Sequence, residues 1–243
     1  MTSQKLQTNF KRIETKYILD KGTLADLKRD LQDYLIDDDY ARSTISNIYF
    51  DNDDYQMVQD SLARRNGREK VRMRTYDSQP SEDSQVFLEI KKKDEEVGYK
   101  FRLVSKPPLV LNYIEKGVQD TIVDDDRVVK ELNHLRDRYC DLKPKMYISY
   151  HRHSMKAKRG HKVRLTVDTN LLYRDEDLDL TLGRYGYPLL ADDKVIMEIK
   201  VSGAYPTWLV HVLKKYGLED QSFSKYGNAY LKRQERLSKL IKS

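Results

Sequence analysis

The sequence predicts an α+β protein in which two-faced strands form a sheet and helices cover its apolar side. Six segments carry charged residues at every second position, so each predicted strand has one charged face and one apolar face. One such strand is typical of any sheet exposed to solvent, but six together indicate a shared charged surface. The segments are Arg12-Glu14-Lys16, Arg68-Lys70-Arg72-Arg74, Glu89-Lys91, Lys100-Arg102, Arg164 with Asp168, and Glu198-Lys200.

The charged faces leave two arrangements open, a flat sheet exposed to solvent and a sheet rolled into a barrel, and the barrel would need an anionic ligand. In a barrel the apolar faces point outward under the helices, and the charged faces point inward. Burying so many cations without a partner is prohibitive, so the interior has to stay wet and be matched by an anion. A polyphosphate chain fits best, because it presents about one negative charge per phosphoryl unit and many acceptor oxygens for Arg and Lys.

Length and composition predict a single domain over residues 1–243, because no linker rich in Pro, Gly or Ser interrupts the chain. The net charge of +6 indicates an anionic partner without choosing among nucleic acid, membrane headgroups and phosphate metabolites. The single Cys140 cannot form an intrachain disulfide, and we see neither a signal peptide nor a run of about 18 apolar residues. We therefore expect a cytoplasmic protein.

The first half of the chain alternates between strand and helix patterns. A strand at 10–19 precedes a helix in which Leu24, Leu27 and Leu31 recur at helical spacing. A strand at 46–51 precedes a short helix through Leu62, which Asp53 or Asp54 could cap. Strands at 68–76 and 85–92 are joined by the polar loop 77–84, and another strand covers 97–104.

The second half begins with Pro107-Pro108, which end the preceding strand, and reads as helical up to residue 139. Strand patterns return at 145–153, 162–167 and 194–201, with a weaker one at 171–173. Pro206 opens a helix, and residues 226–241 form a final basic helix. Asp168 shares a strand face with Arg164 and is expected to fix an arginine through a salt bridge.

Eight short motifs follow one another along nearly the whole chain. They are Phe-Lys-Arg-Ile-Glu-Thr-Lys-Tyr (10–17), Val-Arg-Met-Arg-Thr-Tyr (71–76), Phe-Leu-Glu-Ile-Lys (87–91), Tyr-Lys-Phe-Arg (99–102), Ser-Tyr-His-Arg (149–152), Arg-Leu-Thr-Val-Asp-Thr (164–169), Ile-Met-Glu-Ile-Lys (196–200) and Phe-Ser-Lys-Tyr (223–226). In this order they resemble the catalytic domain of the vacuolar transporter chaperone (VTC) family. Those domains are polyphosphate polymerases of the triphosphate tunnel metalloenzyme superfamily.

The resemblance implies a closed barrel of eight antiparallel strands, the triphosphate tunnel, with helices packed outside. It also implies a metal-dependent phosphotransferase that passes the terminal phosphoryl group of ATP to a growing polyphosphate chain. It implies that Glu198 holds Mn²⁺ or Mg²⁺, which prefer carboxylate oxygens. Glu14 and Glu89 are further candidate ligands, or they only orient neighbouring cations through ion pairs. Phosphate and nucleotide binding falls to Lys16, Arg72, Arg74, Lys91, Lys100, Arg102, Arg152, Arg164, Lys200 and Lys225, of which Lys225, Lys200, Arg152 and Arg164 are candidate catalytic residues.

One departure from the superfamily pattern bears on the reaction. Hydrolase and cyclase branches carry Glu-x-Glu-x-Lys on the first strand, whereas Arg12 replaces the first glutamate here. This loss of a carboxylate favours the polymerase over a triphosphatase of the same fold, which remains an alternative. A non-catalytic module that binds polyphosphate or nucleic acid is another.

The expected partners follow from the same patterns. Nucleic acid is not expected, because most Tyr residues lie on apolar strand faces or in helices and not on an open charged surface. The sequence shows no accessory phosphate-sensing or membrane-spanning region of the kind that eukaryotic VTC proteins carry. Activity at the inner face of a membrane would therefore need a separate membrane protein partner.

Overall fold

The structure is a computed structural model that describes residues 12–95, 97–117, 126–159 and 163–242. Contacts divide it into two compact units. Unit 1 comprises Met1–Arg42, Arg152–Thr169 and Asp192–Ser222, and unit 2 comprises Ser43–His151, Asn170–Ala191 and Phe223–Ser243. Three long strands, β2 (Leu35–Asp51), β6 (Lys143–Ala157) and β7 (Val163–Arg174), contribute residues to both units. The single domain over residues 1–243 stays a prediction.

The strands form one sheet with the order β1-β9-β7-β6-β2-β3-β4-β5, and the short β8 pairs with β7. Neighbouring strands with a determined register are antiparallel, as predicted. The remaining strands are β1 (Arg12–Asp20), β3 (Arg68–Thr75), β4 (Val86–Asp94), β5 (Val97–Ser105), β8 (Tyr187–Pro188) and β9 (Lys194–Ser202).

The prediction of a closed eight-stranded barrel is wrong in its closure, because β1 and β5 end the sheet without pairing with each other. A neighbouring segment occupies part of the outer edge of β1, where the backbone N–H of Gln221 donates to the carbonyl of Lys16 at 2.7 Å. On β5, Val97, Tyr99 and Val104 are exposed, as on an edge strand. The antiparallel α+β class is confirmed, whereas the closed barrel is not.

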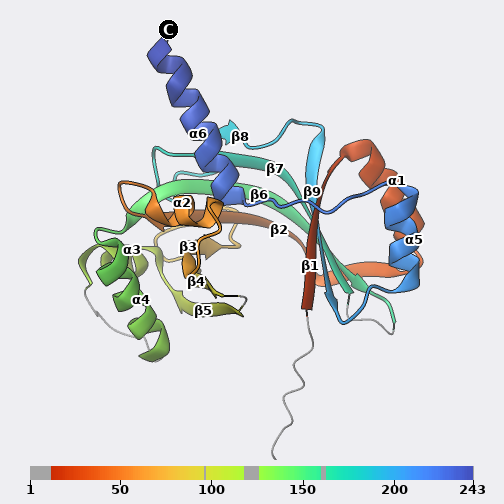
Figure 1. The fold of residues 1–243 in the computed structure, drawn as a ribbon, viewed down its shortest axis with the longest axis horizontal. Helices are drawn as coiled ribbons and strands as arrows, with labels where there is room; N and C mark the ends of the chain where they lie inside the picture. The colour runs from red at the N-terminus through yellow and green to blue at the C-terminus, as the bar shows by residue number, and fades with distance from the viewer. Residues whose placement is uncertain (1–11, 96, 118–125, 160–162, 243) are drawn as a thin grey trace, which may run out of the picture. The chain divides into compact units, whose positions relative to one another are not determined.

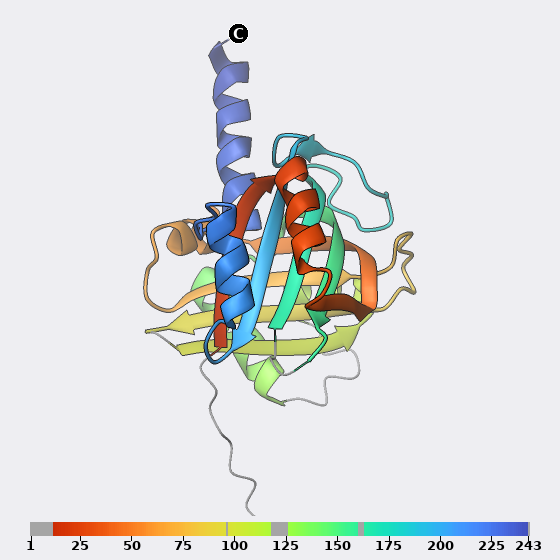
Figure 2. The ribbon, with the colours of Figure 1, turned by 90° about the vertical axis from the view of Figure 1, so that its right-hand side faces the viewer.

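Unit 1 buries the apolar face of β1, β7 and β9 under two helices, α1 (Lys21–Leu31) and α5 (Thr207–Lys215), which lie side by side (Figure 2). Leu27 of α1 and Leu209 of α5 are fully buried against strand residues such as Ile199. The register pairs Lys16 with Glu198, which leaves the charged residues on the other face of the strands. The two-faced strands are therefore confirmed in this unit.

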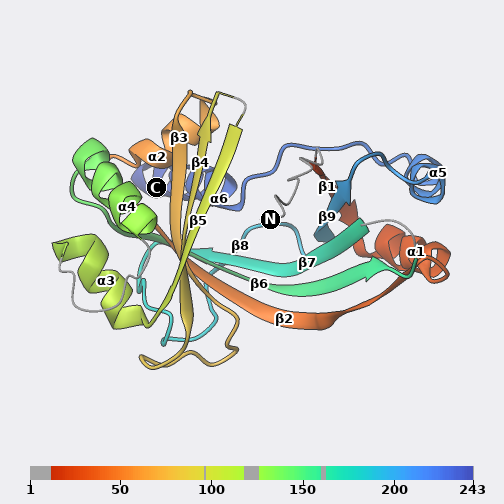
Figure 3. The same ribbon diagram turned by 90° about the horizontal axis from the view of Figure 1, so that it is seen from below.

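Unit 2 covers its part of the sheet with α3 (Pro107–Lys116) and α4 (Asp126–Tyr139), which lie beside β3, β4 and β5 (Figure 3). Leu132 of α4 packs in one core with Val71 of β3 and Ile90 of β4, and all three are buried. The opposite face of these strands carries the alternate residues, which are mostly Arg and Lys.

Two further helices, α2 (Gln56–Leu62) and α6 (Lys225–Lys242), contact each other in unit 2 (Figure 1). Asp51, the last residue of β2, accepts hydrogen bonds from the backbone N–H groups of Met57 and Val58 at 2.9 and 3.0 Å. Asp51 also accepts a hydrogen bond from the hydroxyl of Tyr226 on α6 at 2.9 Å. Asp51 thus satisfies the start of α2, the role predicted for Asp53 or Asp54.

We predict that Asp51→Ala lowers the free energy of unfolding by about 2–4 kcal/mol, because it removes a helix cap and leaves the buried Tyr226 hydroxyl unpaired. Asp53→Ala is the control, since Asp53 is exposed and pairs at the surface with Lys143 and Lys145. Denaturant titration measures both variants. Equal losses in the two would contradict the capping role.

Candidate functional site

The charged face of β3, β4 and β5 forms the densest group of predicted site residues in unit 2. Across neighbouring strands, Arg72 lies opposite Glu89, and Glu89 lies opposite Arg102. One step along, Lys91 lies opposite Lys100. Like charges opposite one another on a sheet are destabilising, so this arrangement favours an added anion.

Four cations converge on the one carboxylate of Glu89, which is 1% exposed. Arg72 donates two hydrogen bonds to its Oε2, from Nε at 2.9 Å and from Nη2 at 2.5 Å. Lys100 Nζ lies 2.8 Å from Oε1, and the Arg102 and Arg74 guanidinium groups lie 3.6 and 3.9 Å from the carboxylate. One carboxylate cannot neutralise four cations, so the cluster keeps an excess of positive charge.

Neutral side chains from β2 and β6 hold the two inner arginines in place. Arg74 Nε donates to Asn47 Oδ1 at 2.7 Å, and its Nη2 donates to the Tyr150 hydroxyl at 3.0 Å. Arg72 Nη1 donates to the Tyr49 hydroxyl at 3.2 Å. These partners add no charge, so they orient the guanidinium groups without cancelling them.

The excess charge shifts two neighbouring acidic groups. Burial of Glu89 opposes its ionisation, but the charges of Arg72 and Arg74 outweigh burial and hold the carboxyl pKa well below its usual range. Burial likewise opposes ionisation of Tyr49, yet Arg72, Arg74 and Lys225 lower the pKa of its phenol to about 8. Both shifts indicate a positive potential at this face.

Lys225 begins α6 in the same unit, with its Nζ 4.6 Å from the centre of the Tyr150 ring. The next residue, Tyr226, is buried and stacks on Tyr49 with ring centroids 4.7 Å apart. Since Tyr49 and Tyr150 also accept hydrogen bonds from Arg72 and Arg74, the first turn of α6 is fixed against the cluster around Glu89.

The charged face of unit 1 carries a second group, in which carboxylates and cations are more evenly matched. Lys200 Nζ lies 2.5 Å from Glu198 and 3.5 Å from Glu14, and Lys16 Nζ lies 3.8 Å from Glu14. Burial opposes ionisation of Glu198, but Lys200, Arg152 and Lys16 together lower its carboxyl pKa. Glu198 is therefore ionised at neutral pH.

The two predicted arginines of unit 1 are held differently. Arg152 makes a two-pronged contact with buried Asp168, from Nε at 2.6 Å and from Nη2 at 2.8 Å. Asp168 therefore fixes an arginine, as expected, but the arginine comes from β6. Arg164 is half exposed and pairs instead with Asp38 at 2.8 Å.

A divalent metal fits one of these groups better than the other. Glu14 and Glu198 both contact the ammonium of Lys200, so the two hard oxygen donors already converge on a cation. Glu89 is surrounded by four cations, which would repel a metal. The residues described contain no group of three or more His, Cys, Asp or Glu side chains able to hold a metal ion. A metal held by Glu14 and Glu198 would need further ligands from water or substrate.

The structure thus distributes the predicted residues over two groups, and their binding roles stay predictions. Sequence reasoning missed Asn47 and Tyr49, although the alternation through Asp51 places all three on one strand face. Unit 2 holds Arg72, Arg74, Lys91, Lys100, Arg102, Glu89 and Lys225, and unit 1 holds Glu14, Lys16, Arg152, Arg164, Glu198 and Lys200.

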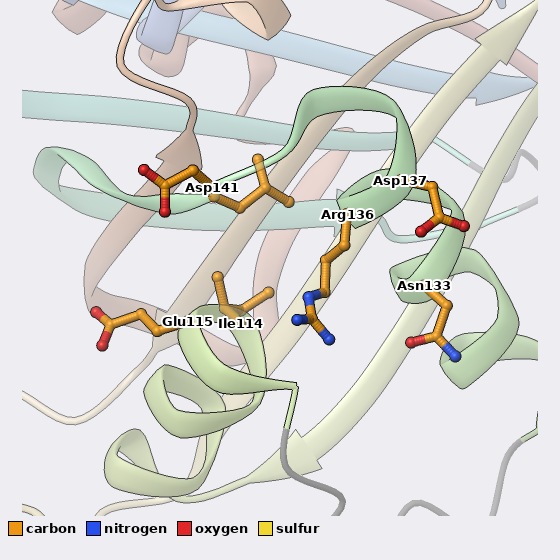
Figure 4. Close-up of a pocket in the computed structure, with 7 residues that line it drawn as sticks. Ile114, Glu115, Asn133, Arg136, Asp137 and Asp141 are labelled. Carbon is orange, nitrogen blue, oxygen red and sulfur yellow. The ribbon is translucent and has the colours of Figure 1, made fainter.

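A cavity of about 390 Å³ in unit 2 lies where α3, α4 and the start of β6 meet (Figure 4). It is lined by charges of both signs, among them Glu115, Arg136 and Asp141. None of the predicted site residues lines it. Its mixed charge favours neither an anion nor a cation, so the cation cluster remains the candidate site.

The chain combines an antiparallel sheet that is charged on one face with helices that bury the other face. A solved structure from Bacillus halodurans, titled a "putative adenylate cyclase", shares this fold with a TM-score of 0.52 and 15% identity over 88% of this chain and 93% of that one. A family model described as the VTC domain matches residues 11–233. The chain therefore belongs to the VTC domain family.

A curated relative is the "Vacuolar transporter chaperone complex subunit 4" of Schizosaccharomyces pombe, which is 24% identical over 268 aligned positions. The match covers 90% of this chain but 37% of that protein, so the chain spans little more than a third of its length. Within the described ranges, we find no helix that combines the length and apolar character needed to cross a membrane.

We predict that Glu89→Gln destabilises the ligand-free protein by about 3 kcal/mol, because the four cations lose their common counter-ion. Tripolyphosphate should restore much of the loss, so the thermal shift on adding it should be larger in the variant than in the parent. Glu82→Gln, an exposed change in the same unit, is the control. A variant as stable as the parent, or one that tripolyphosphate does not rescue, would contradict this role of Glu89.

A second prediction concerns pH. The pKa of Tyr49 is about 8 in the folded protein against 10.0 for a free phenol, so its ionisation stabilises the fold fully above pH 10 and this contribution is lost as pH falls through about 8. Phenolate absorbance should show a titration near pH 8 in the parent that is lost in Tyr49→Phe. Tripolyphosphate should raise this pKa by neutralising Arg72 and Arg74.

The control for this titration is Tyr113→Phe, because burial raises the pKa of Tyr113 and its hydroxyl has no hydrogen-bond partner among the described residues. The change should leave the titration near pH 8 intact. If the parent and Tyr49→Phe titrate alike up to about pH 9, the positive potential around Tyr49 is not as described.

Proposed function

We propose that this chain is a polyphosphate polymerase that transfers the terminal phosphoryl group of ATP to inorganic polyphosphate. The observation that carries the proposal is the convergence of Arg72, Arg74, Lys100 and Arg102 on the single carboxylate of Glu89. Membership of the VTC domain family supports it further, since a relative in that family is a subunit of a transporter chaperone complex.

In the proposed reaction the protein supplies position and charge. Phosphoryl transfer needs little covalent help, because the main requirements are an in-line acceptor and neutralisation of the phosphoryl oxygens. Arg72 and Arg74 present guanidinium forks suited to two phosphate oxygens at once. Lys225, held over the Tyr150 ring at the start of α6, adds a compact charge for the transferred group.

In unit 1 we assign phosphate contacts to Lys16, Arg152, Arg164 and Lys200. The salt bridge to Asp168 fixes the orientation of the Arg152 guanidinium, which lowers the entropy that a phosphate contact would cost. Arg164 could exchange Asp38 for a phosphate, because the Arg164 side chain is half exposed and Asp38 would keep Lys156 as an ion-pair partner.

Glu198 and Glu14 would hold Mn²⁺ or Mg²⁺ in this proposal, and Glu89 would not. When bound, the metal neutralises charge on the phosphates of ATP. Glu198 is suited to this role because its lowered pKa keeps it ionised, and because it is almost fully buried on the charged face. Lys200 would have to move away from the two carboxylates as the metal enters.

We further propose that the protein acts on the cytoplasmic side of a membrane with the help of a membrane protein partner. The support is the name of the curated relative, a subunit of a transporter complex that is far longer than this chain. The described helices cannot themselves span a bilayer, so attachment would come from elsewhere.

The direct test is to incubate the protein with ATP and Mn²⁺ or Mg²⁺ and to resolve the products on a gel that separates phosphate polymers. We expect chains longer than three phosphoryl units. Glu198→Gln should require more than tenfold more metal for the same rate, because it removes a hard anionic ligand, while tripolyphosphate binding persists.

The matched control is Glu219→Gln, an exposed change in the same unit. It should leave both the rate and the metal requirement unchanged. If the parent releases only ADP and orthophosphate, the chain is a triphosphatase of the same fold. If it neither transfers nor hydrolyses, a phosphate-binding module replaces both enzymes.

A further inference from the structure

The cationic face of β3, β4 and β5 continues beyond the cluster around Glu89. Lys70 lies opposite Lys91, which lies opposite Lys100, and one step further Arg68 lies opposite Lys93. Glu89 is the one carboxylate among the described residues on this face of the three strands. The face therefore carries eight cations, namely Arg68, Lys70, Arg72, Arg74, Lys91, Lys93, Lys100 and Arg102.

The face becomes more accessible along this direction. The Arg74 and Arg72 side chains are 8% and 13% exposed, whereas that of Lys100 is 52% exposed. Lys91 and Lys93 are exposed as well, and Arg68 and Lys70 are half-buried. Each set of residues that lie opposite one another on β3, β4 and β5 forms a row, and the outermost row is Arg68, Lys93 and Gly98. At Gly98 an added Cβ would meet no atom within 4 Å. The cations thus run from a buried end to an open one.

A triphosphate is too short to use all of these rows. Seven strand residues from Arg68 to Arg74 span roughly 20 Å. Two P–O bonds separate neighbouring phosphorus atoms, so three phosphoryl groups reach only a fraction of this length. An extended polyphosphate chain, with a charge on every unit, matches the repeated rows of cations.

Two other roles, protection of a sheet edge and binding of nucleic acid, explain fewer of these cations than binding of polyphosphate does. Lysine on an edge strand prevents pairing with other chains, but this explains Lys100 on β5 and not Lys70 or Lys93, which lie on inner strands. A single-stranded nucleic acid would need aromatic platforms for its bases. Phe87 is the one aromatic residue on this face of the three strands as described, and the Arg102 guanidinium covers its ring at 3.7 Å.

We propose that Arg68, Lys70 and Lys93, together with Lys91 and Lys100, form an outer binding track for the polyphosphate chain, leading from the cluster around Glu89 to the open end of the β4–β5 hairpin. This track rests on the proposed function, because it gives the growing chain a binding surface beyond the first three phosphoryl groups. It selects for long polyanions over tripolyphosphate.

The test is to measure the affinities of tripolyphosphate and of long-chain polyphosphate by titration calorimetry. Lys93→Ala should weaken binding of the long chain about threefold, and Arg68→Ala with Lys93→Ala about tenfold, as expected for exposed charge pairs. The affinity for tripolyphosphate should stay within about twofold of the parent in both. Lys93 is exposed, so its single variant should fold even if loss of Arg68, which donates to the carbonyls of Arg64 and Arg65, disturbs the double one.

Lys232→Ala on α6 removes the same charge from the same unit and should change neither affinity. Variants that bind long chains as well as the parent, or that lose both affinities equally, would overturn the track. A single-stranded oligonucleotide that binds as tightly as polyphosphate and depends equally on Lys93 would overturn the assigned ligand. Absence of polymer from ATP, with the selectivity for long chains retained, would refute the polymerase and leave the track standing.

Discussion

The structure of the cation-rich face depends on one imbalance, in which a single buried carboxylate serves four cations. Glu89 makes it possible to bring Arg72 and Arg74 together in a mostly buried position, and it leaves them with charge to spare. Neutral partners, Asn47 and the two tyrosine hydroxyls, complete their hydrogen bonds without adding negative charge. A face with as many carboxylates as cations would be more stable, because buried ion pairs repay their desolvation only when fully satisfied. It would attract anions less strongly, because no excess positive charge would remain.

The same strands connect this imbalance to the core. Since alternate residues point to opposite faces, each arginine on β3 is followed by a buried residue, as Arg72 is by Met73. The helices α3 and α4 bury one face, and this burial fixes the register that aligns the cations on the other. In unit 1, α1 and α5 do the same for the strands that carry Glu14, Glu198 and Lys200. Core packing and ligand chemistry are therefore set by one alternating pattern.

That alternation explains which features could be predicted from the sequence. The strand faces, the covering helices and the VTC family followed from local patterns and short motifs. The prediction that the barrel closes was wrong, because closure depends on pairing between the two edge strands, which local patterns do not specify. Gln221 instead contacts the β1 edge from a segment far along the chain. The cap of α2 was assigned to Asp53 or Asp54 by proximity, whereas Asp51 reaches it from the end of a strand. Arg152 was expected at the site, but its fixing by Asp168 joins residues from two different strands.

The central claim is that the excess charge around Glu89 holds phosphate. A crystal structure of the chain with tripolyphosphate tests it most directly. We expect phosphate oxygens within hydrogen-bonding distance of the Arg72 and Arg74 guanidinium groups, with Lys100 or Arg102 drawn from Glu89 towards the ligand. Tripolyphosphate bound elsewhere, with all four contacts to Glu89 unchanged, would contradict the claim.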